Sequence, residues 1–175
     1  RGEPVVGVIL NPAAGSAVWA SAGDGTFRDG TRVRVSRKTQ LAEAVVIASR
    51  TEISRNQFEP YEGWFAELRP VGSIAWKLAC SASGEGDLNI SVAPKSEWDV
   101  CAGDVLVREA GGIYVGFDRT TRRYNQAKTL IDAGMAAGAS SGRASTRSLD
   151  SLVPRSLWPG KPEAGGPACF GSLTG

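Results

Sequence analysis

Short apolar stretches alternate with glycine-rich turns at the start of the chain. The segment Pro4–Leu10 is rich in valine, and residues 17–22 form a second short apolar run. The turns Gly23-Asp24-Gly25 and Asp29-Gly30 contain glycines, which tolerate the positive φ that tight hairpin turns require. Residues 32–36 alternate between polar and apolar side chains, as a half-exposed strand does. The pattern predicts an antiparallel meander with one face toward solvent.

Strand patterns and helix patterns then alternate through residues 45–116. The spacing of apolar residues predicts a largely buried helix over 73–83. A second helix, with a clearer apolar stripe, is expected to begin at Asp99 and to stop at the Gly-Gly pair of 111–112. Alternating strands and helices predict a layered α/β fold. The strands are expected at residues 45–49, 68–71, 87–92 and 113–116.

Two further stretches carry weaker signals. A helix is expected to run as far as Ala66, with either Ser54 or Asn56 as its N-cap. Residues 137–175 are rich in glycine, serine and proline and lack apolar periodicity, which predicts a loop or a disordered tail. We therefore divide the chain into one domain over residues 1–136 and a tail over 137–175.

Charge and hydropathy narrow the classes of partner. The 175 residues carry 20 basic and 18 acidic side chains, a net charge of +2, which is too small to indicate binding to nucleic acid or to a membrane surface. No apolar run approaches the ~20 residues that a membrane-spanning helix needs. We therefore expect neither nucleic acid nor a membrane as a partner.

The usable chemistry is restricted by what the composition lacks. The chain has no histidine, which excludes catalysis by Ser-His-Asp or Cys-His groups and a zinc site with histidine ligands. Cys80, Cys101 and Cys169 stand far apart and form no CxxC pair, which is typical of a protein in the reducing cytoplasm. Any chemistry must use carboxylates, hydroxyls, lysine, arginine or a metal held by oxygen.

The most specific string begins at Glu97, and its central residue is Asp99 at the predicted helix start. Small residues that follow, at 102–103, would let the backbone approach a ligand closely. A carboxylate at this position can cap its own helix, or it can turn outward and bind a hard cation. The residues alone leave both interpretations open.

The string resembles the second signature of the inositol monophosphatase family. The match comprises Trp98, Asp99, Ala102, Gly103, Glu109, Ala110, Gly111 and Gly112. The resemblance extends over about residues 4–136 and implies a layered αβαβα fold of the sugar-phosphatase type, of which this chain is the C-terminal part. It also implies that Asp99 is a ligand of a catalytic Mg²⁺ and that the substrate is a small phosphorylated metabolite.

The same resemblance implies a set of substrate-binding residues. Residues 71–75 are similar to the Gly-Ser/Thr helix start that lines the family's substrate site, and residues 48–51 resemble a segment that borders the nucleotide in the bacterial CysQ-type 3'(2'),5'-bisphosphate nucleotidases. Val92 stands where inositol-specific enzymes place a Glu, which favours the nucleotidase branch over inositol phosphate. The expected contacts are Gly72, Ser73, Lys77, Ser49 and Arg50.

Each of these residues also has a purely structural interpretation. Gly72 and Ser73 can be a turn with an N-cap, and Ser49 with Arg50 can be a polar strand end. Lys77 on a helix is usually a surface residue whose stem lies along the protein. Glu52 stands where animal nucleotidases place a His, which is a departure from that branch.

Two of the family's metal motifs are missing from the sequence. No Asp-Pro dipeptide is present, and the glutamates do not form the Glu-Glu segment that supplies most of the family's metal ligands. We therefore expect a phosphatase part with no catalytic residue set of its own, inactive alone and extended upstream in its parent. A non-catalytic module that acts through protein association is the alternative, and the resemblance also admits a homodimer of the full-length form.

Overall fold

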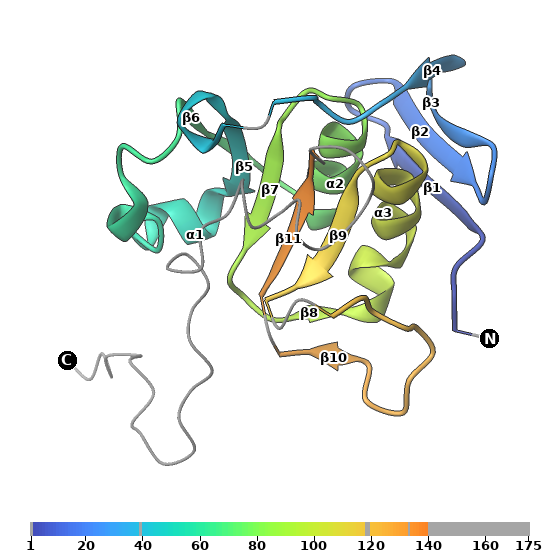
Figure 1. Ribbon diagram of the computed structural model, residues 1–175. Helices are drawn as coiled ribbons and strands as arrows, with labels where there is room; N and C mark the ends of the chain where they lie inside the picture. The colour runs from blue at the N-terminus through green and yellow to red at the C-terminus, as the bar shows by residue number, and fades with distance from the viewer. Residues whose placement is uncertain (1, 39, 118–119, 133, 140–175) are drawn as a thin grey trace.

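The computed structural model of the chain describes residues 2–38, 40–117, 120–132 and 134–139. Two helices, α2 (Ile74–Ala82) and α3 (Glu97–Glu109), lie side by side between two β-sheets, as Figure 1 shows. This arrangement confirms the predicted layered α/β fold. None of the described helices is long and apolar enough to cross a bilayer.

The first sheet contains four antiparallel strands in sequence order, which confirms the predicted meander. Its inward face packs on α3 through Ile9, Val18 and Ala20, which are all buried. The opposite face points away from the helices. The strands are β1 (Val6–Asn11), β2 (Ser16–Ser21), β3 (Gly25–Arg28) and β4 (Thr31–Val33).

The second sheet contains five strands in the order β6-β5-β7-β11-β9. Strand β5 runs parallel to β6 and β7, whereas β11 runs antiparallel to β7 and β9. Buried residues from 41–65 and the sheet's far face form a separate apolar cluster. The strands are β5 (Val45–Ser49), β6 (Glu67–Val71), β7 (Leu88–Ser91), β9 (Ile113–Gly116) and β11 (Met135–Gly138).

Strand β11 corrects the predicted boundary between the domain and the tail. The boundary at 136/137 falls inside this strand, and the residues of 137–139 are buried with the rest of the sheet. The strand was missed because its residues are small and buried on both faces, so no alternation of polar and apolar positions marks it. The remainder of the predicted tail, 140–175, lies outside the described residues.

The helix predicted to reach Ala66 is wrong. Helix α1 spans Arg50–Ser54, and a single 3₁₀ turn at Glu59–Tyr61 follows it. Asn56 adopts a φ of 55°, which stops the helix there, and Gly63 turns the chain again with a φ of 79°. Another 3₁₀ turn covers Leu41–Glu43, and the short strands β8 (Lys95–Ser96) and β10 (Leu130–Ile131) pair with each other.

Helix α3 packs closely on both of its neighbours because small residues face them. A Cβ atom on Gly7 of β1 would lie 2.5 Å from the carbonyl oxygen of Ala102. A Cβ atom on Gly103 would lie 2.4 Å from Cδ1 of Leu78 on α2. The glycines therefore set the distances from α3 to the first sheet and to α2.

Hydrogen bonds fix the same helix against the first sheet near its C-terminal end. The Thr26 hydroxyl donates to the Leu106 carbonyl at 2.7 Å. Glu109 Oε2 accepts from the backbone N–H groups of Gly23 and Gly25 at 3.0 and 3.1 Å. The glutamate of the family-like motif thus anchors the β2–β3 turn.

We expect Gly103→Ala to lower the free energy of unfolding by about 1–3 kcal/mol, because the new methyl group would overlap Leu78. This loss outweighs the gain of about 1 kcal/mol in helix propensity. Chemical denaturation of the variant and the unaltered chain measures the difference in the free energy of unfolding. The control is Val6→Ala at an exposed position, with an expected change within about 0.5 kcal/mol. An unchanged or raised midpoint for Gly103→Ala would contradict the packing argument.

Candidate functional site

The predicted substrate residues converge where β5 and β6 end and α2 begins. The parallel register places Ser49, the last residue of β5, beside Val71, the last residue of β6. Gly72 and Ser73 follow β6 directly and lead into α2. The carboxyl ends of neighbouring parallel strands meet at one edge of a sheet, and such edges carry ligand sites in α/β proteins.

Arg50 and Gly72 are in close contact at this edge. A Cβ atom on Gly72 would lie 2.6 Å from a terminal nitrogen of Arg50, so the guanidinium rests on the glycine backbone. Ser73 adopts a φ of 60°, and its side chain accepts a hydrogen bond from Trp76 N at 3.3 Å as the N-cap of α2. A non-glycine residue in this strained conformation is common at functional sites. The structural reading of Ser73 as an N-cap is therefore confirmed, in a place that also suits ligand binding.

Lys77 is not the surface residue that its helical position suggests. Its side chain is one helical turn beyond Ser73 and only 2% exposed. Burial lowers the pKa of Lys77 to about 8, a shift that the carboxylate of Glu52 opposes and the ammonium of Lys95 reinforces. An ammonium removed from water in this way is well placed to interact with a negatively charged group.

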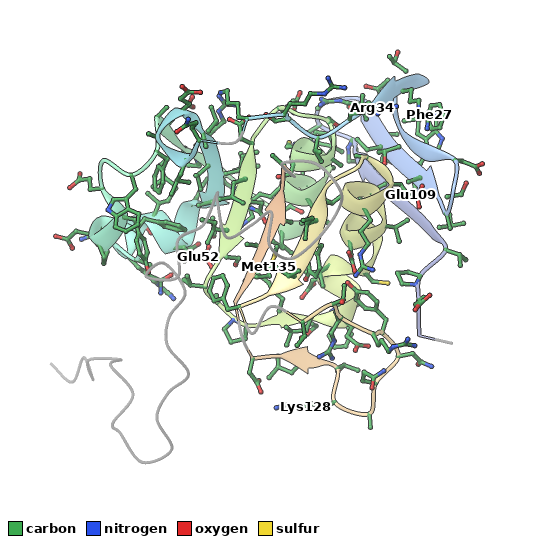
Figure 2. All side chains as sticks on the ribbon, in the orientation of Figure 1. Phe27, Arg34, Glu52, Glu109, Lys128 and Met135 are labelled. Carbon is green, nitrogen blue, oxygen red and sulfur yellow. The ribbon has the colours of Figure 1, made fainter. Side chains whose placement is uncertain are left out.

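Glu52 is a site residue that the sequence reasoning missed. It lies on α1, is buried, and occupies the space beside the end of β7, as Figure 2 shows. Its Oε1 atom accepts from the Ser91 hydroxyl at 2.7 Å and from Ala93 N at 3.0 Å, and Lys95 Nζ lies 3.9 Å away. Among the described residues, Oε2 has no hydrogen-bond partner. The available signal was its position just after a buried strand that ends at the ligand-binding edge.

Asp99 continues this series of charged groups at the start of α3. Helix α3 begins at Glu97, two residues before the expected start, and its N-cap is Ser96. Asp99 Oδ2 accepts from Ser96 N at 2.9 Å and so completes a capping box, which gives Asp99 the capping role that was one of the two interpretations. Burial lowers the pKa of Lys95, and the carboxylates of Glu52 and Asp99 oppose that shift. Electrostatic interactions therefore link Asp99 through Lys95 and Glu52 to Lys77.

The arrangement fits one part of a magnesium site. Within residues 2–38, 40–117, 120–132 and 134–139, no three His, Cys, Asp or Glu side chains gather closely enough to hold a metal ion. Mg²⁺ requires six oxygen ligands in near-octahedral geometry. Asp99 can supply one carboxylate ligand, and the rest must come from substrate, water or residues beyond those described.

The basic groups of this region suit an anionic ligand. Arg50 contacts Gly72 just before α2, and Lys77 lies in the first turn of α2, whose free backbone N–H groups also attract negative charge. Lys95 Nζ lies 3.9 Å from Glu52. The thiols of Cys80 and Cys101 are poor nucleophiles, because burial raises the pKa of Cys80 to about 12 and also raises the pKa of Cys101. Cys169 lies outside the described residues.

This chain belongs to the inositol monophosphatase family, whose model matches residues 1–153. It is 34% identical over 131 residues to inositol monophosphatase 2 of Saccharomyces cerevisiae, a match that covers 66% of this chain and 44% of the yeast protein. The resemblance noted from the motif at residues 97–112 is thus confirmed. The chain spans about half the length of the curated relatives it matches.

Solved structures share the fold. The extragenic suppressor protein SuhB of Bartonella henselae superposes with a TM-score of 0.69 at 26% identity, over 91% of this chain and 58% of that one. CysQ of Bacteroides thetaiotaomicron, described as a bacterial member of the same family, gives a TM-score of 0.65 at 24% identity over 79% of this chain and 59% of its own. The likeness to CysQ concerns the fold alone.

We expect the Lys77 side chain to titrate near pH 8, well below a normal lysine, when followed by NMR of ¹³C-labelled lysine Cε. Glu52→Gln removes the carboxylate that stabilises the charged form of Lys77, so it should lower the pKa of Lys77 further. Lys95→Ala removes a repelling ammonium and should raise the pKa of Lys77. Lys38→Ala removes an ammonium that pairs with Asp87 and is the control, with no change expected. If neither Glu52→Gln nor Lys95→Ala changed the pKa of Lys77, the electrostatic interaction among these three residues would be contradicted.

Proposed function

We propose that this chain is the substrate-binding part of a Mg²⁺-dependent phosphomonoesterase that acts on a small phosphorylated metabolite. The observation that carries the proposal is the burial of Lys77 and Glu52, with Lys95 Nζ 3.9 Å from Glu52, next to the starts of α2 and α3, where Ser73 and Asp99 lie. Family membership supports the hydrolase class and the use of magnesium. Asp99 would hold one metal ion, which would neutralise charge on the substrate phosphate.

The basic residues favour a substrate with two phosphate groups. Gly72 and Ser73 would contact the phosphate nearest the metal. Arg50, Lys77 and the strand end at Ser49 would accept a second anionic group. A 3'(2'),5'-bisphosphate nucleotide fits this requirement better than a monophosphate does. An inositol phosphate remains the alternative substrate, since the curated relatives include proteins named inositol monophosphatase and fructose-1,6-bisphosphatase/inositol-1-monophosphatase.

We further propose that the chain is inactive by itself and works in the cytoplasm. The incomplete ligand set among the described residues supports the first point, because a single carboxylate binds Mg²⁺ weakly. The free thiols of Cys80 and Cys101 support the second. The same incomplete ligand set supports the alternative function, a non-catalytic module that acts through protein association.

Metal binding at Asp99 can be tested on the full chain. Mn²⁺ substitutes for Mg²⁺ and broadens NMR signals close to where it binds, so we expect broadening of the α3 N-terminal amides that excess Mg²⁺ reverses. Asp99→Asn should weaken this binding by roughly tenfold or more, because the carboxylate ligand is lost. Asp132→Asn removes an exposed carboxylate elsewhere and should change nothing. Equal broadening in Asp99→Asn and in the unaltered chain would count against the proposal.

Substrate class can be tested through Arg50. Replacement by Ala should weaken binding of 3'-phosphoadenosine 5'-phosphate by about 10-fold to 100-fold, the usual effect of losing a charge-assisted hydrogen bond. Binding of inositol 1-phosphate should fall far less, since it has no second phosphate. Arg55→Ala, at an exposed position beyond the end of α1, is the matched control. Calorimetric titration measures both affinities. If Arg50→Ala weakened the binding of both ligands equally, a bisphosphate substrate would not be supported.

A further inference from the structure

A cavity of about 300 Å³ is lined by residues of β9, β10 and β11 and by the loop that precedes β10. Tyr114 and Gly116 of β9 and Met135 of β11 contribute the sheet side, and Leu130 and Ile131 of β10 contribute to the other side. Sites for small molecules have volumes of about 300–1,000 Å³, so this cavity is large enough for a small organic compound. It shares no lining residue with the candidate functional site, and it is called the β10 cavity below.

Tyr114 brings an unused hydrogen-bonding group to the β10 cavity. Its side chain is 2% exposed, and its hydroxyl has no hydrogen-bond partner among the described residues. The nearby carboxylate of Asp104 is occupied, since its Oδ2 atom accepts from Arg108 Nη2 and from Tyr124 Oη, each at 2.8 Å. Burial, and after it the charge of Asp104, raises the pKa of Tyr114, so its hydroxyl keeps its proton and can donate. Buried polar groups without a partner are rare and unfavourable, which makes this one a sign of a missing acceptor.

Arg122 brings a second unused donor to the same cavity. Its Nη2 atom donates to Glu97 Oε1 at 2.7 Å and to the Lys128 carbonyl at 3.0 Å, so the guanidinium is held in place. Its Nε atom is buried and has no partner within the part of the chain that the structure describes. Arginine keeps its charge in proteins, so Nε can only donate. The hydroxyl of Tyr114 and Nε of Arg122 therefore both lack an acceptor.

The charges around the β10 cavity are balanced. Arg122 pairs with Glu97 at 2.7 Å, and Lys128 pairs with Asp132. Figure 2 shows Lys128 on the loop below Met135. Because each of these two cations already has a carboxylate partner, neither is left to neutralise a charged ligand. Apolar side chains complete the wall, namely those of Leu130, Ile131 and Met135.

We infer that the β10 cavity binds a small neutral carbonyl compound with an apolar body. Its oxygen accepts from the Tyr114 hydroxyl and from Arg122 Nε, because one carbonyl oxygen has two lone pairs and can serve two donors. Its apolar body packs on Ile131 and Met135. The inference does not rest on the proposed function, because this binding can be measured without turnover.

Met135 provides the signal for a direct test. It is the single methionine among the 175 residues, so ¹³C-methyl labelling reports on the wall of the β10 cavity, and Met135→Leu checks the assignment. Titration of the full chain with acetophenone should shift this signal until it saturates, because the aromatic ring lies beside the methyl group. The absence of a saturable shift would mean that the cavity holds water only, and the inference would be wrong.

Two further probes test the chemical class of the ligand. Ethylbenzene resembles acetophenone but lacks the oxygen, so it should bind roughly tenfold more weakly, because both donors stay unpaired. Benzoate keeps the ring and the oxygen and adds a negative charge, so it should also bind more weakly, because no cation of the wall is left for it. Equal affinities for acetophenone and ethylbenzene would contradict the inference. Tighter binding of benzoate would contradict the assignment of a neutral ligand.

A matched pair of substitutions locates the hydrogen bond. Tyr114→Phe removes the hydroxyl and keeps the ring, so it should weaken acetophenone roughly tenfold and leave ethylbenzene unchanged. Tyr61→Phe removes a hydroxyl that does not line the cavity and should change neither affinity. Circular dichroism checks that both variants fold. Unchanged acetophenone binding in Tyr114→Phe, or an equal loss in both variants, would overturn the inference.

The outcome is independent of the proposed function. Asp99→Asn and an excess of 3'-phosphoadenosine 5'-phosphate should both leave the affinity for acetophenone unchanged. Competition between the two compounds would place acetophenone in the candidate functional site and overturn the inference. If 3'-phosphoadenosine 5'-phosphate does not bind while acetophenone shifts the Met135 signal, the proposed function loses support and the β10 cavity remains a binding site.

Discussion

The close packing of α3 between two sheets is the constraint on which the rest of this structure depends. The helix touches β1 at Ala102 and α2 at Gly103, and at each contact one partner is a glycine. Larger residues would push the layers apart and move the start of α3. The small residues of the signature motif are thus explained by packing, and Asp99 is the motif residue whose position the packing sets.

A second constraint is the burial of opposite charges at the sheet edge. Removing Glu52 and Lys77 from water is costly unless their charges are compensated. Hydrogen bonds from Ser91 and from Ala93 N stabilise one oxygen of the carboxylate, while its other oxygen is left without a partner among the described residues. Buried charges with incomplete pairing contribute little to stability, which makes Glu52 and Lys77 candidates for a functional site.

The elements that could be predicted from the sequence are those with one buried face and one exposed face. The meander is marked by short apolar runs between glycine turns, and α3 carries an apolar stripe, so both can be recognised in the sequence. Strand β11 is buried on both faces and made of small residues, and it carries neither signal. The site follows the same division, because Ser49 and Gly72 lie at strand ends that the sequence marks. Glu52 also follows a strand end, which was the available signal, but its burial depends on Ser91 and Ala93, about 40 residues further along the chain.

Strand β1 connects the exposed face of the first sheet with the candidate site. Alternate side chains of a strand point to opposite faces, so Gly7 contacts the α3 backbone while Val6 and Val8 face outward. A change that shifts this strand therefore also shifts the surface on which α3 rests. Since Asp99 lies in the first turn of α3, the position of its carboxylate depends on how the first sheet packs against this helix. The first sheet and the candidate site are thus expected to be coupled through one strand and one helix.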